Sequence, residues 1–241
     1  VERIPRAGDP GTYNQTWFDP GTRIVPDRRT SLVIDPPDGR IPYTPEMRER
    51  GRLQAAYRVG GARNSWVDVD TGERCLTDGL PMFWLGYNPN HQIVQTPDHV
   101  VILHEMFRDR RIIPLDGRPH VGDDIRLWMG DSRGRWEGDT LVVETINFND
   151  TPAFSQGSRN KKVTERFRME SADQLIYSFT VEDPSVWTAP FTGEYAWPRS
   201  PNKVFEYACH EANYALEGIM KGARLLEAVF RGEDPGGVPN P

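Results

Sequence analysis

The sequence has few of the features that mark membrane proteins or nucleic-acid-binding proteins. No apolar run approaches the ~20 residues that a transmembrane helix needs. The 29 Lys and Arg residues are outnumbered by 35 acidic residues, which gives a formal net charge of −6. Basic residues are scattered and form no stripe interleaved with aromatic residues that would attract a phosphate backbone. We therefore expect no membrane span and no nucleic-acid partner.

Local metal-binding motifs are also missing, since the chain contains no CxxC, HxH or HExxH. The histidines could meet at a metal only from distant strands, and we predict no metal and no cofactor. These histidines are His91, His99, His104, His120 and His210.

The chain has only two cysteines, Cys75 and Cys209. Two cysteines can be inert buried thiols, a disulfide, or half of a metal site. The chain begins Val1-Glu2-Arg3, as a processed exported precursor or a trimmed chain would. In an exported protein the two thiols would be oxidised, so a disulfide is our expectation.

Glycine and proline are abundant, at 22 and 21 of 241 residues, which favours short strands joined by turns over long helices. A chain of this length suits an all-β sandwich or barrel built as one unit. The spacing of apolar runs and turn signals predicts an antiparallel, lipocalin-like β-barrel or a strongly curved sandwich. The predicted strands are 31–34, 91–95, 99–107, 111–115, 139–147, 162–169, 174–181, 191–197 and 204–210.

The flanking segments differ from this β-rich centre. Residues 1–30 are rich in Gly, Pro, Arg and Asp and have no core of their own, so we predict an extended N-terminal arm. A Thr-Pro N-cap signal opens a short N-terminal helix, and a second helix is predicted near the C-terminus over 212–230. The β-rich domain spans 31–231, and 232–241 forms a flexible tail. The arm could engage neighbouring subunits in a homo-oligomer or a larger assembly.

Four stretches of the chain resemble a large group of exported bacterial proteins of unassigned function. They are Arg29–Pro42 (RTSLVIDPPDGRIP), Ile113–His120 (IPLDGRPH), Gly130–Leu141 (GDSRGRWEGDTL) and Glu206–Glu211 (EYACHE). The resemblance implies that a secretion signal is removed upstream of Val1, that the protein is periplasmic or extracellular, and that the cysteines are oxidised. It implies no reaction. The chain departs from the group at His104, where relatives often carry Tyr, and this argues against a role for His104.

The turn that follows residue 115 brings an acid, a guanidinium and an imidazole close together. Asp116 could orient His120, which could then move a proton near neutral pH, while Arg118 held an anionic or hydroxylated group. The structural alternative is that Asp116 closes an Asx-turn with Gly117, Arg118 is solvated, and His120 caps a carbonyl.

Two further catalytic candidates come from strand alternation. Glu105 lies in an apolar strand, and a buried carboxylate is costly unless it is paired. It is therefore a candidate general base, or else the partner of an arginine such as Arg111, which could otherwise bind substrate. His210 would share a face with Glu206 in the predicted strand 204–210, and the two could form an acid–base pair.

A G-x-S-x-G pattern at 130–134 matches the nucleophile elbow of hydrolases, but a turn and a strand follow it where the elbow needs a helix. We therefore predict a glycine-rich β-turn there. Trp84 and Tyr87 neighbour a polar stretch that includes Asn90, and these three residues are candidate ligand contacts at a barrel mouth.

Two functions remain open. One is an exported enzyme, a lyase, hydrolase or isomerase, that performs acid–base chemistry on a small or carbohydrate-like molecule. The other is a non-catalytic ligand-binding or assembly protein. The enzyme requires His120, Glu105 and His210 to converge on one pocket, whereas separation or saturation of these groups favours the binding protein.

Overall fold

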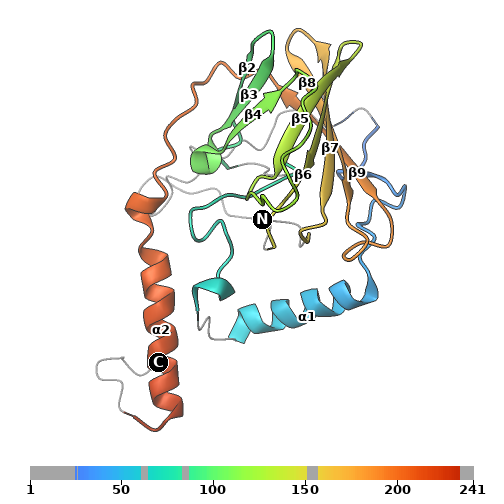
Figure 1. Cartoon of the computed structure of the whole chain (residues 1–241). Helices are drawn as coiled ribbons and strands as arrows, with labels where there is room; N and C mark the ends of the chain where they lie inside the picture. Colours follow the sequence, from blue (N-terminus) through green and yellow to red (C-terminus); the bar gives the residue numbers. More distant parts are fainter. Residues whose placement is uncertain (1–24, 26, 61–64, 83–86, 151–156, 234–241) are drawn as a thin grey trace.

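A computed structural model describes residues 25, 27–60, 65–82, 87–150 and 157–233 of the chain. The predicted contact Trp84 and most of the predicted arm lie outside these residues. The described part is mainly β, with two antiparallel sheets and two α-helices (Figure 1). At the end of the predicted arm, Arg29 Nη2 donates to the backbone oxygen of Glu194 at 3.0 Å.

The larger sheet has six strands in the order β1-β9-β8-β7-β6-β5, and every neighbouring pair is antiparallel. Strands β5 to β9 follow one another as a meander, and the short β1 adds to the far side of β9. The strands are β1 (Val33–Asp35), β5 (Asp131–Glu137), β6 (Thr140–Ile146), β7 (Lys162–Ser171), β8 (Gln174–Glu182) and β9 (Phe191–Pro198).

The smaller sheet is a meander of β2 (His91–Gln95), β3 (His99–His104) and β4 (Arg110–Pro114). It packs on the larger sheet where β4 meets β5. A Cβ added at Gly134 would lie 2.7 Å from side-chain atoms of both Ile113 and Leu115, so only glycine allows this approach. Among the described strands no ladder closes the sheets into a barrel, and the curved sandwich is the alternative that forms.

Alternate residues of the strands fill the space between the sheets, as the two-residue period of a strand requires. Val163 and Phe167 of β7 and Tyr177 and Phe179 of β8 face Ile102 and its neighbours from the smaller sheet. Burial of each such aliphatic or aromatic side chain contributes about 1.5–3 kcal/mol to the stability of the folded state. The alternation of the strands therefore supplies a large part of that stability.

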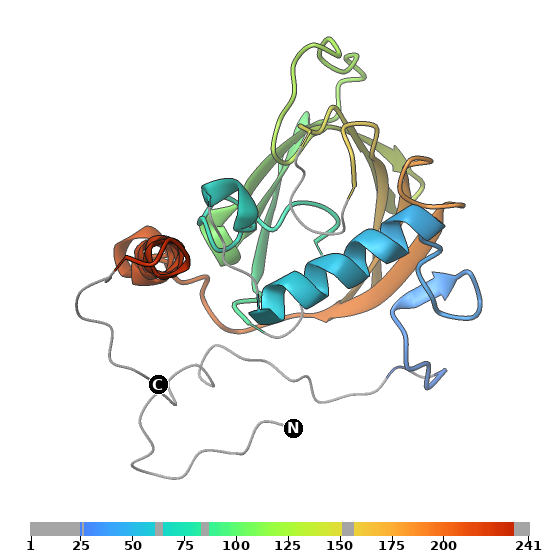
Figure 2. The ribbon, with the colours of Figure 1, turned by 90° about the horizontal axis from the view of Figure 1, so that it is seen from below.

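The helices lie outside the sandwich. Helix α1 (Pro45–Gly60) begins after Thr44, whose Oγ1 accepts the Met47 amide at 3.3 Å, as the Thr-Pro signal predicts. It crosses one open end of the sheets (Figure 2). Helix α2 (Tyr214–Phe230) stands away from both sheets and from α1. No helix within the described ranges is long and apolar enough to cross a membrane. The described residues also form three short 3-10 turns, η2 (Trp66–Asp68), η3 (Met106–Arg108) and η4 (His210–Ala212).

Three sequence predictions about local structure are wrong. The predicted glycine-rich turn at 130–134 is mostly strand, because Gly130 (φ +67°) turns the chain and Asp131 then begins β5. The predicted strand 204–210 is irregular chain that ends in η4. The predicted strand 99–107 ends early: β3 stops at His104 because Glu105 adopts helical angles (φ −64°, ψ −46°) and begins the turn into η3, where Phe107 and Arg108 have positive φ.

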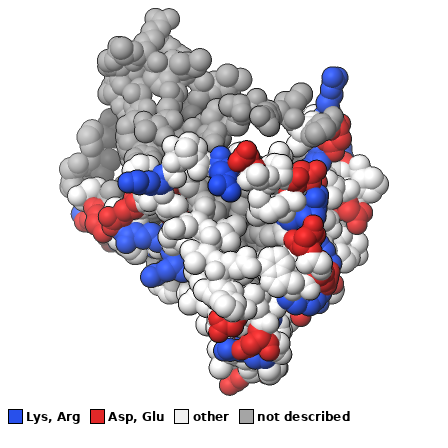
Figure 3. Space-filling model, turned by 90° about the horizontal axis from the view of Figure 1, so that it is seen from above, with Lys and Arg blue, Asp and Glu red and all other residues white. Residues whose placement is uncertain are grey.

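Acidic and basic side chains are interspersed on the face that Figure 3 shows. Elsewhere in the described residues, Arg135 pairs with Glu137 and Lys162 with Glu144, with closest nitrogen–oxygen distances of 2.5 and 2.6 Å.

Candidate functional site

A pocket of about 480 Å³ opens where the irregular segment 204–213 meets the first turns of α2. One wall combines aromatic and acidic side chains, and the other is the apolar side of the helix. The polar and aromatic wall includes Glu73, Tyr87, Asn88, Glu206 and Tyr207. The helix contributes Ala215, Leu216 and Ile219. Of the ligand contacts predicted from sequence, Tyr87 lines this pocket.

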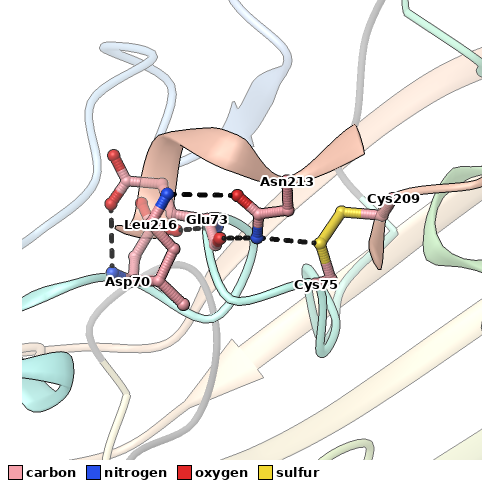
Figure 4. The surroundings of a disulfide bond; sticks show 6 residues. All are labelled: Asp70, Glu73, Cys75, Cys209, Asn213 and Leu216. Atoms are coloured by element: carbon pink, nitrogen blue, oxygen red, sulfur yellow. Dashed lines mark hydrogen bonds between the residues drawn. A yellow bond between two sulfur atoms is a disulfide. The ribbon is translucent and has the colours of Figure 1, made fainter. Parts of the chain in front are cut away.

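The disulfide Cys75–Cys209 joins the two sides of the pocket (Figure 4). Its Cα atoms lie 5.7 Å apart across a sequence separation of 134 residues, and Cys209 itself lines the pocket. The predicted pairing is therefore present. The bond ties segment 204–213 to the loop that carries Glu73.

Asn213 strengthens the same junction (Figure 4). Its Oδ1 accepts the Leu216 amide at 3.3 Å and so caps the N-terminus of α2. Its Nδ2 donates to the Glu73 carbonyl at 2.8 Å and approaches Cys75 Sγ at 3.3 Å. One side chain thus fixes where α2 starts and how the helix sits against the loop.

Glu105 anchors the segment that leads into the pocket and is saturated with hydrogen bonds. Its carboxylate accepts Asn88 Nδ2 at 2.6 Å, Asn90 Nδ2 at 3.2 Å and the Phe205 amide at 3.0 Å. Only 1% of the residue is exposed. The carboxylate is buried and held by three protein donors, so Glu105 joins the smaller sheet to segment 204–213. Asn90, predicted to bind ligand, serves the same junction.

The pocket carries acidic charge. Glu73 and Glu206 both line it, and the described lining residues include no lysine or arginine. Glu206 forms an ion pair with Arg108 of η3, which holds the carboxylate at the rim. Glu73 Oε2 accepts the Asp70 amide at 3.2 Å. These contacts orient the two carboxylates.

His120 lies on the outer face of the larger sheet, away from the pocket residues. Its Nδ1 is 2.8 Å from Asp131 Oδ2, and its Nε2 is 3.6 Å from Glu144 Oε1. Burial raises the pKa of Asp131, but hydrogen bonds from the Val121 amide, His120 and Arg133 outweigh it and lower the pKa overall. The carboxylate that orients His120 is thus Asp131.

Asp116, predicted to orient His120, pairs instead with Arg118. The Arg118 side chain and backbone amide both donate to this exposed carboxylate and lower its pKa to about 2. Of the structural alternative, the Asx-turn is present, since Asp116 Oδ1 accepts the Arg118 amide at 3.1 Å. Arg118 is not simply solvated, because it is paired with Asp116. The third part is wrong, because His120 contacts the Asp131 carboxylate instead of capping a carbonyl. Arg118 is therefore engaged by its neighbour in sequence.

Arg111 is a core residue. Its guanidinium binds Glu165 through both Nη atoms, at 2.9 and 2.5 Å. Nη2 also reaches the hydroxyls of Ser132 and Thr145, and Glu165 Oε1 accepts the Tyr177 hydroxyl at 2.7 Å. This network lies in the core between the two sheets. The predicted pairing of Arg111 with Glu105 is not formed.

A stack of rings lies beside this network on the inner faces of the sheets. The ring of His91 lies between those of Trp197, at a centroid distance of 4.0 Å, and His104, at 4.5 Å. Burial lowers the pKa of His104 to about 4 and also lowers the pKa of His91, where His104 and Arg111 add to the effect. Both imidazoles are neutral at physiological pH and serve as aromatic packing.

His210, the remaining catalytic candidate, is exposed at the start of η4. Its proposed partner Glu206 is bound to Arg108. The candidate catalytic residues therefore contact separate sets of neighbours. The structure brings together Glu105 with Asn90 and Asp116 with Arg118, and none of the four candidates lines the pocket.

Sequence reasoning missed several residues that build the site or the core. Glu165 could have been found, because it alternates with Val163 and Phe167 on one strand face. Asn213 stands just before the apolar period of α2, where an N-cap residue is expected.

Lys161 is buried in the core, and no local sequence pattern indicated its burial. Burial lowers its pKa to about 7 although Asp183 opposes this, and its Nζ donates to the Leu80 carbonyl at 3.0 Å.

No set of three or more His, Cys, Asp or Glu side chains that could hold a metal ion occurs in the described part of the chain. Compared with known proteins, the chain matches no protein-family model, no curated protein and no solved structure. The resemblance to exported bacterial proteins therefore stays a prediction that rests on its four motifs.

Proposed function

We propose that the protein is an exported, non-catalytic binding protein that holds a small ring-containing molecule, uncharged or cationic, in the pocket beside α2. The pocket is the observation that carries this proposal. Its volume of about 480 Å³ falls in the range of small-molecule sites, and its walls are fixed by a disulfide, a helix cap and the Glu105 junction.

The lining indicates the class of ligand. Tyr87 and Tyr207 provide ring faces on which a flat molecule can pack. Carboxylates of Glu73 and Glu206 line the pocket and no described lining residue is basic, which disfavours an anion, although Arg108 offsets the charge of Glu206. The aromatic faces attract an ammonium group. Apolar Leu216 and Ile219 suit the body of such a molecule.

Binding is favoured over catalysis because the catalytic candidates do not meet. Glu105 is buried and bound by three protein donors, and His120 is held between Asp131 and Glu144 on the outer face of the larger sheet. Acid–base catalysis requires a group within hydrogen-bonding reach of the substrate proton.

The disulfide also supports export. The cytosol keeps thiols reduced, whereas the periplasm and the extracellular space allow disulfides to persist. A pocket whose wall includes Cys209 would lose that wall's anchor in a reducing compartment.

The test is calorimetric titration of the oxidised protein with three compounds of similar size: phenethylammonium, 2-phenylethanol and phenylacetate. We expect affinity to fall in that order. Ala208→Trp places a large ring in the pocket from an exposed position, and it should abolish binding. Ala172→Trp, in the exposed β7–β8 turn, is the matched control and should bind as the parent does.

Tightest binding of phenylacetate would contradict the charge argument. Unchanged binding in Ala208→Trp would place the site elsewhere. No binding of any of the three compounds would overturn the proposed ligand class.

A further inference from the structure

Helix α2 exposes an unusually apolar face. Tyr214, Leu226, Val229 and Phe230 are 79%, 59%, 56% and 93% exposed. At 100° per residue they lie on one side of the helix together with the small residues Ala215, Gly218 and Gly222. The charged residues Glu217, Lys221 and Arg224 gather on the other side.

The two glycines leave a shallow hollow in the middle of this face. A Cβ added at Gly218 or at Gly222 would meet nothing within 4 Å. Glycine inside a helix lowers helix stability relative to alanine, so two glycines in one helix are best explained by a close approach. Figures 1 and 2 show that neither sheet nor α1 makes that approach, because α2 stands apart from them.

The face is complementary to itself when two helices run antiparallel about Gly222. Gly218 then lies opposite Leu226 of the other helix, and Ala215 lies opposite Val229. Tyr214 and Phe230 lie at the two edges of the face, because at 100° per residue they are separated by 160° around the helix. Leu226 and Val229 of one helix thus meet the small residues Gly218 and Ala215 of the other. A parallel pair would instead set Phe230 against Phe230 and Gly218 against Gly218.

Charge does not oppose this pairing. Glu217 is bound to Lys221 and Arg224 to Glu227 within the same helix. The face between Tyr214 and Phe230 therefore buries no charge. A chain with a net charge of −6 can bring two copies together here without placing like charges at the centre.

We propose that α2 is the dimerisation element of this protein and that a second copy of the chain packs on it, antiparallel about Gly222. Such an interface is isologous, since the same patch serves both subunits. Two helices of this length bury on the order of 1,000 Å² in total, at the lower limit of specific interfaces. The dimer is therefore expected to dissociate on dilution.

Sedimentation velocity of the full, oxidised chain over a concentration series tests the proposal. The native protein should approach twice 27.5 kDa at high concentration. Gly222→Leu should weaken the dimer at least tenfold, because two leucines would meet at the axis. Leucine favours helix more than glycine does, so unchanged circular dichroism would show that α2 persists. Arg224→Ala, on the charged side, should leave the dimer intact.

Cysteine cross-linking tests the register. Ala215→Cys and Val229→Cys variants, mixed and oxidised, should form a covalent dimer, and Ala215→Cys alone should not. Cross-linking of Ala215→Cys alone would indicate a parallel pair and overturn the proposed geometry. A native chain that stays monomeric at all concentrations, or a dimer that Gly222→Leu does not weaken, would overturn the proposal itself.

Discussion

The carboxylates of Asp78 and Asp109 should make the folded protein less stable as the pH rises. Asp109 Oδ2 accepts the Thr77 hydroxyl at 2.5 Å, while Asp78 Oδ2 is buried without a hydrogen-bond partner among the described residues. Burial, with the charges of Asp109 and Asp70, raises the pKa of Asp78 to about 7. Burial raises the pKa of Asp109 to about 6, although hydrogen bonds from Thr77 and the Asp78 amide oppose it.

The sign follows from proton linkage. In the unfolded chain these carboxyls ionise near their ordinary values of about 4, so between pH 4 and 7 the folded state holds more protons. The free energy of unfolding therefore falls as the pH rises through this window, and the loss persists above the folded pKa. For Asp78 alone, about three pKa units correspond to at most about 4 kcal/mol, and partial exposure reduces this to about 1–3 kcal/mol.

Asp78→Asn removes the ionisation while it keeps the shape of the side chain. We expect the variant to gain about 1–3 kcal/mol over the parent at pH 8, where Asp78 is charged, and almost nothing at pH 4, where it is neutral. The measurement is urea unfolding followed by tryptophan fluorescence at both pH values. The difference between variant and parent cancels the titrating groups that do not interact with Asp78, whereas Asp109 and Asp70, whose charges raise its pKa, contribute to the difference.

Asp116→Asn is the matched control. This exposed carboxylate has a lowered pKa because of Arg118, so its removal should bring no gain at pH 8. A gain for Asp78→Asn of equal size at pH 4 and pH 8 would refute the reasoning, because the benefit would then not depend on charge. A loss of stability at pH 8 would refute it as well.

Two further predictions concern the core and the disulfide. Glu165→Gln should destabilise the fold by about 3–5 kcal/mol in urea unfolding, because it leaves the buried Arg111 guanidinium without a counter-charge. The double variant Arg111→Met/Glu165→Leu should be more stable than Glu165→Gln, and a double variant that is less stable would contradict this account. Replacing Cys75 and Cys209 by serine should cost about 5 kcal/mol in the chain-entropy model for a loop of 134 residues, and it should weaken ligand binding to the pocket. Unchanged affinity in that variant would show that the pocket does not depend on the bond.

Where local pattern and burial agree, the sequence is enough to predict the fold. Strands β6 to β9 alternate cleanly between faces, and each lies within a few residues of its predicted range. Helix α1 starts at Pro45, where the Thr-Pro signal places it. The failures at 130–134 and 204–210 have long-range causes. Strand β5 tolerates Gly134 because Ile113 presses against it, and segment 204–210 is held by Glu105 and Cys75.

The contacts of the candidate site residues were harder to predict, because the fold decides which charged side chains lie close enough to pair, and sequence spacing alone does not show this. Asp116 was expected to orient His120, but its carboxylate instead accepts hydrogen bonds from Arg118, two residues along the chain. The carboxylate that meets His120 is Asp131, brought there by β5. Glu165 reaches Arg111 across 54 positions, and no local spacing signals such a contact.

The interior of the sandwich helps to explain why the pocket lies at its margin. A lipocalin-like protein would keep the space between its strands for a ligand, but here Arg111, Glu165 and Tyr177 occupy that space with mutual hydrogen bonds. Opening it would leave a charge unpaired and buried. The proposed ligand site therefore lies outside this interior, between segment 204–213 and α2, where the disulfide joins the segment to the loop that carries Cys75.

The proposed pocket and the proposed dimer share part of this helix. Ala215 lines the pocket, and the antiparallel pairing sets Val229 of a second copy opposite it. A bound molecule would then contact or approach the partner subunit, so binding and dimerisation would not be independent. Thermodynamic linkage makes such coupling reciprocal. A ligand that lowers the dissociation constant of the dimer must bind the dimer with higher affinity than it binds the monomer. If the ligand's affinity were the same for Gly222→Leu as for the parent, the two sites would be energetically separate, and Val229 would lie outside the ligand's reach.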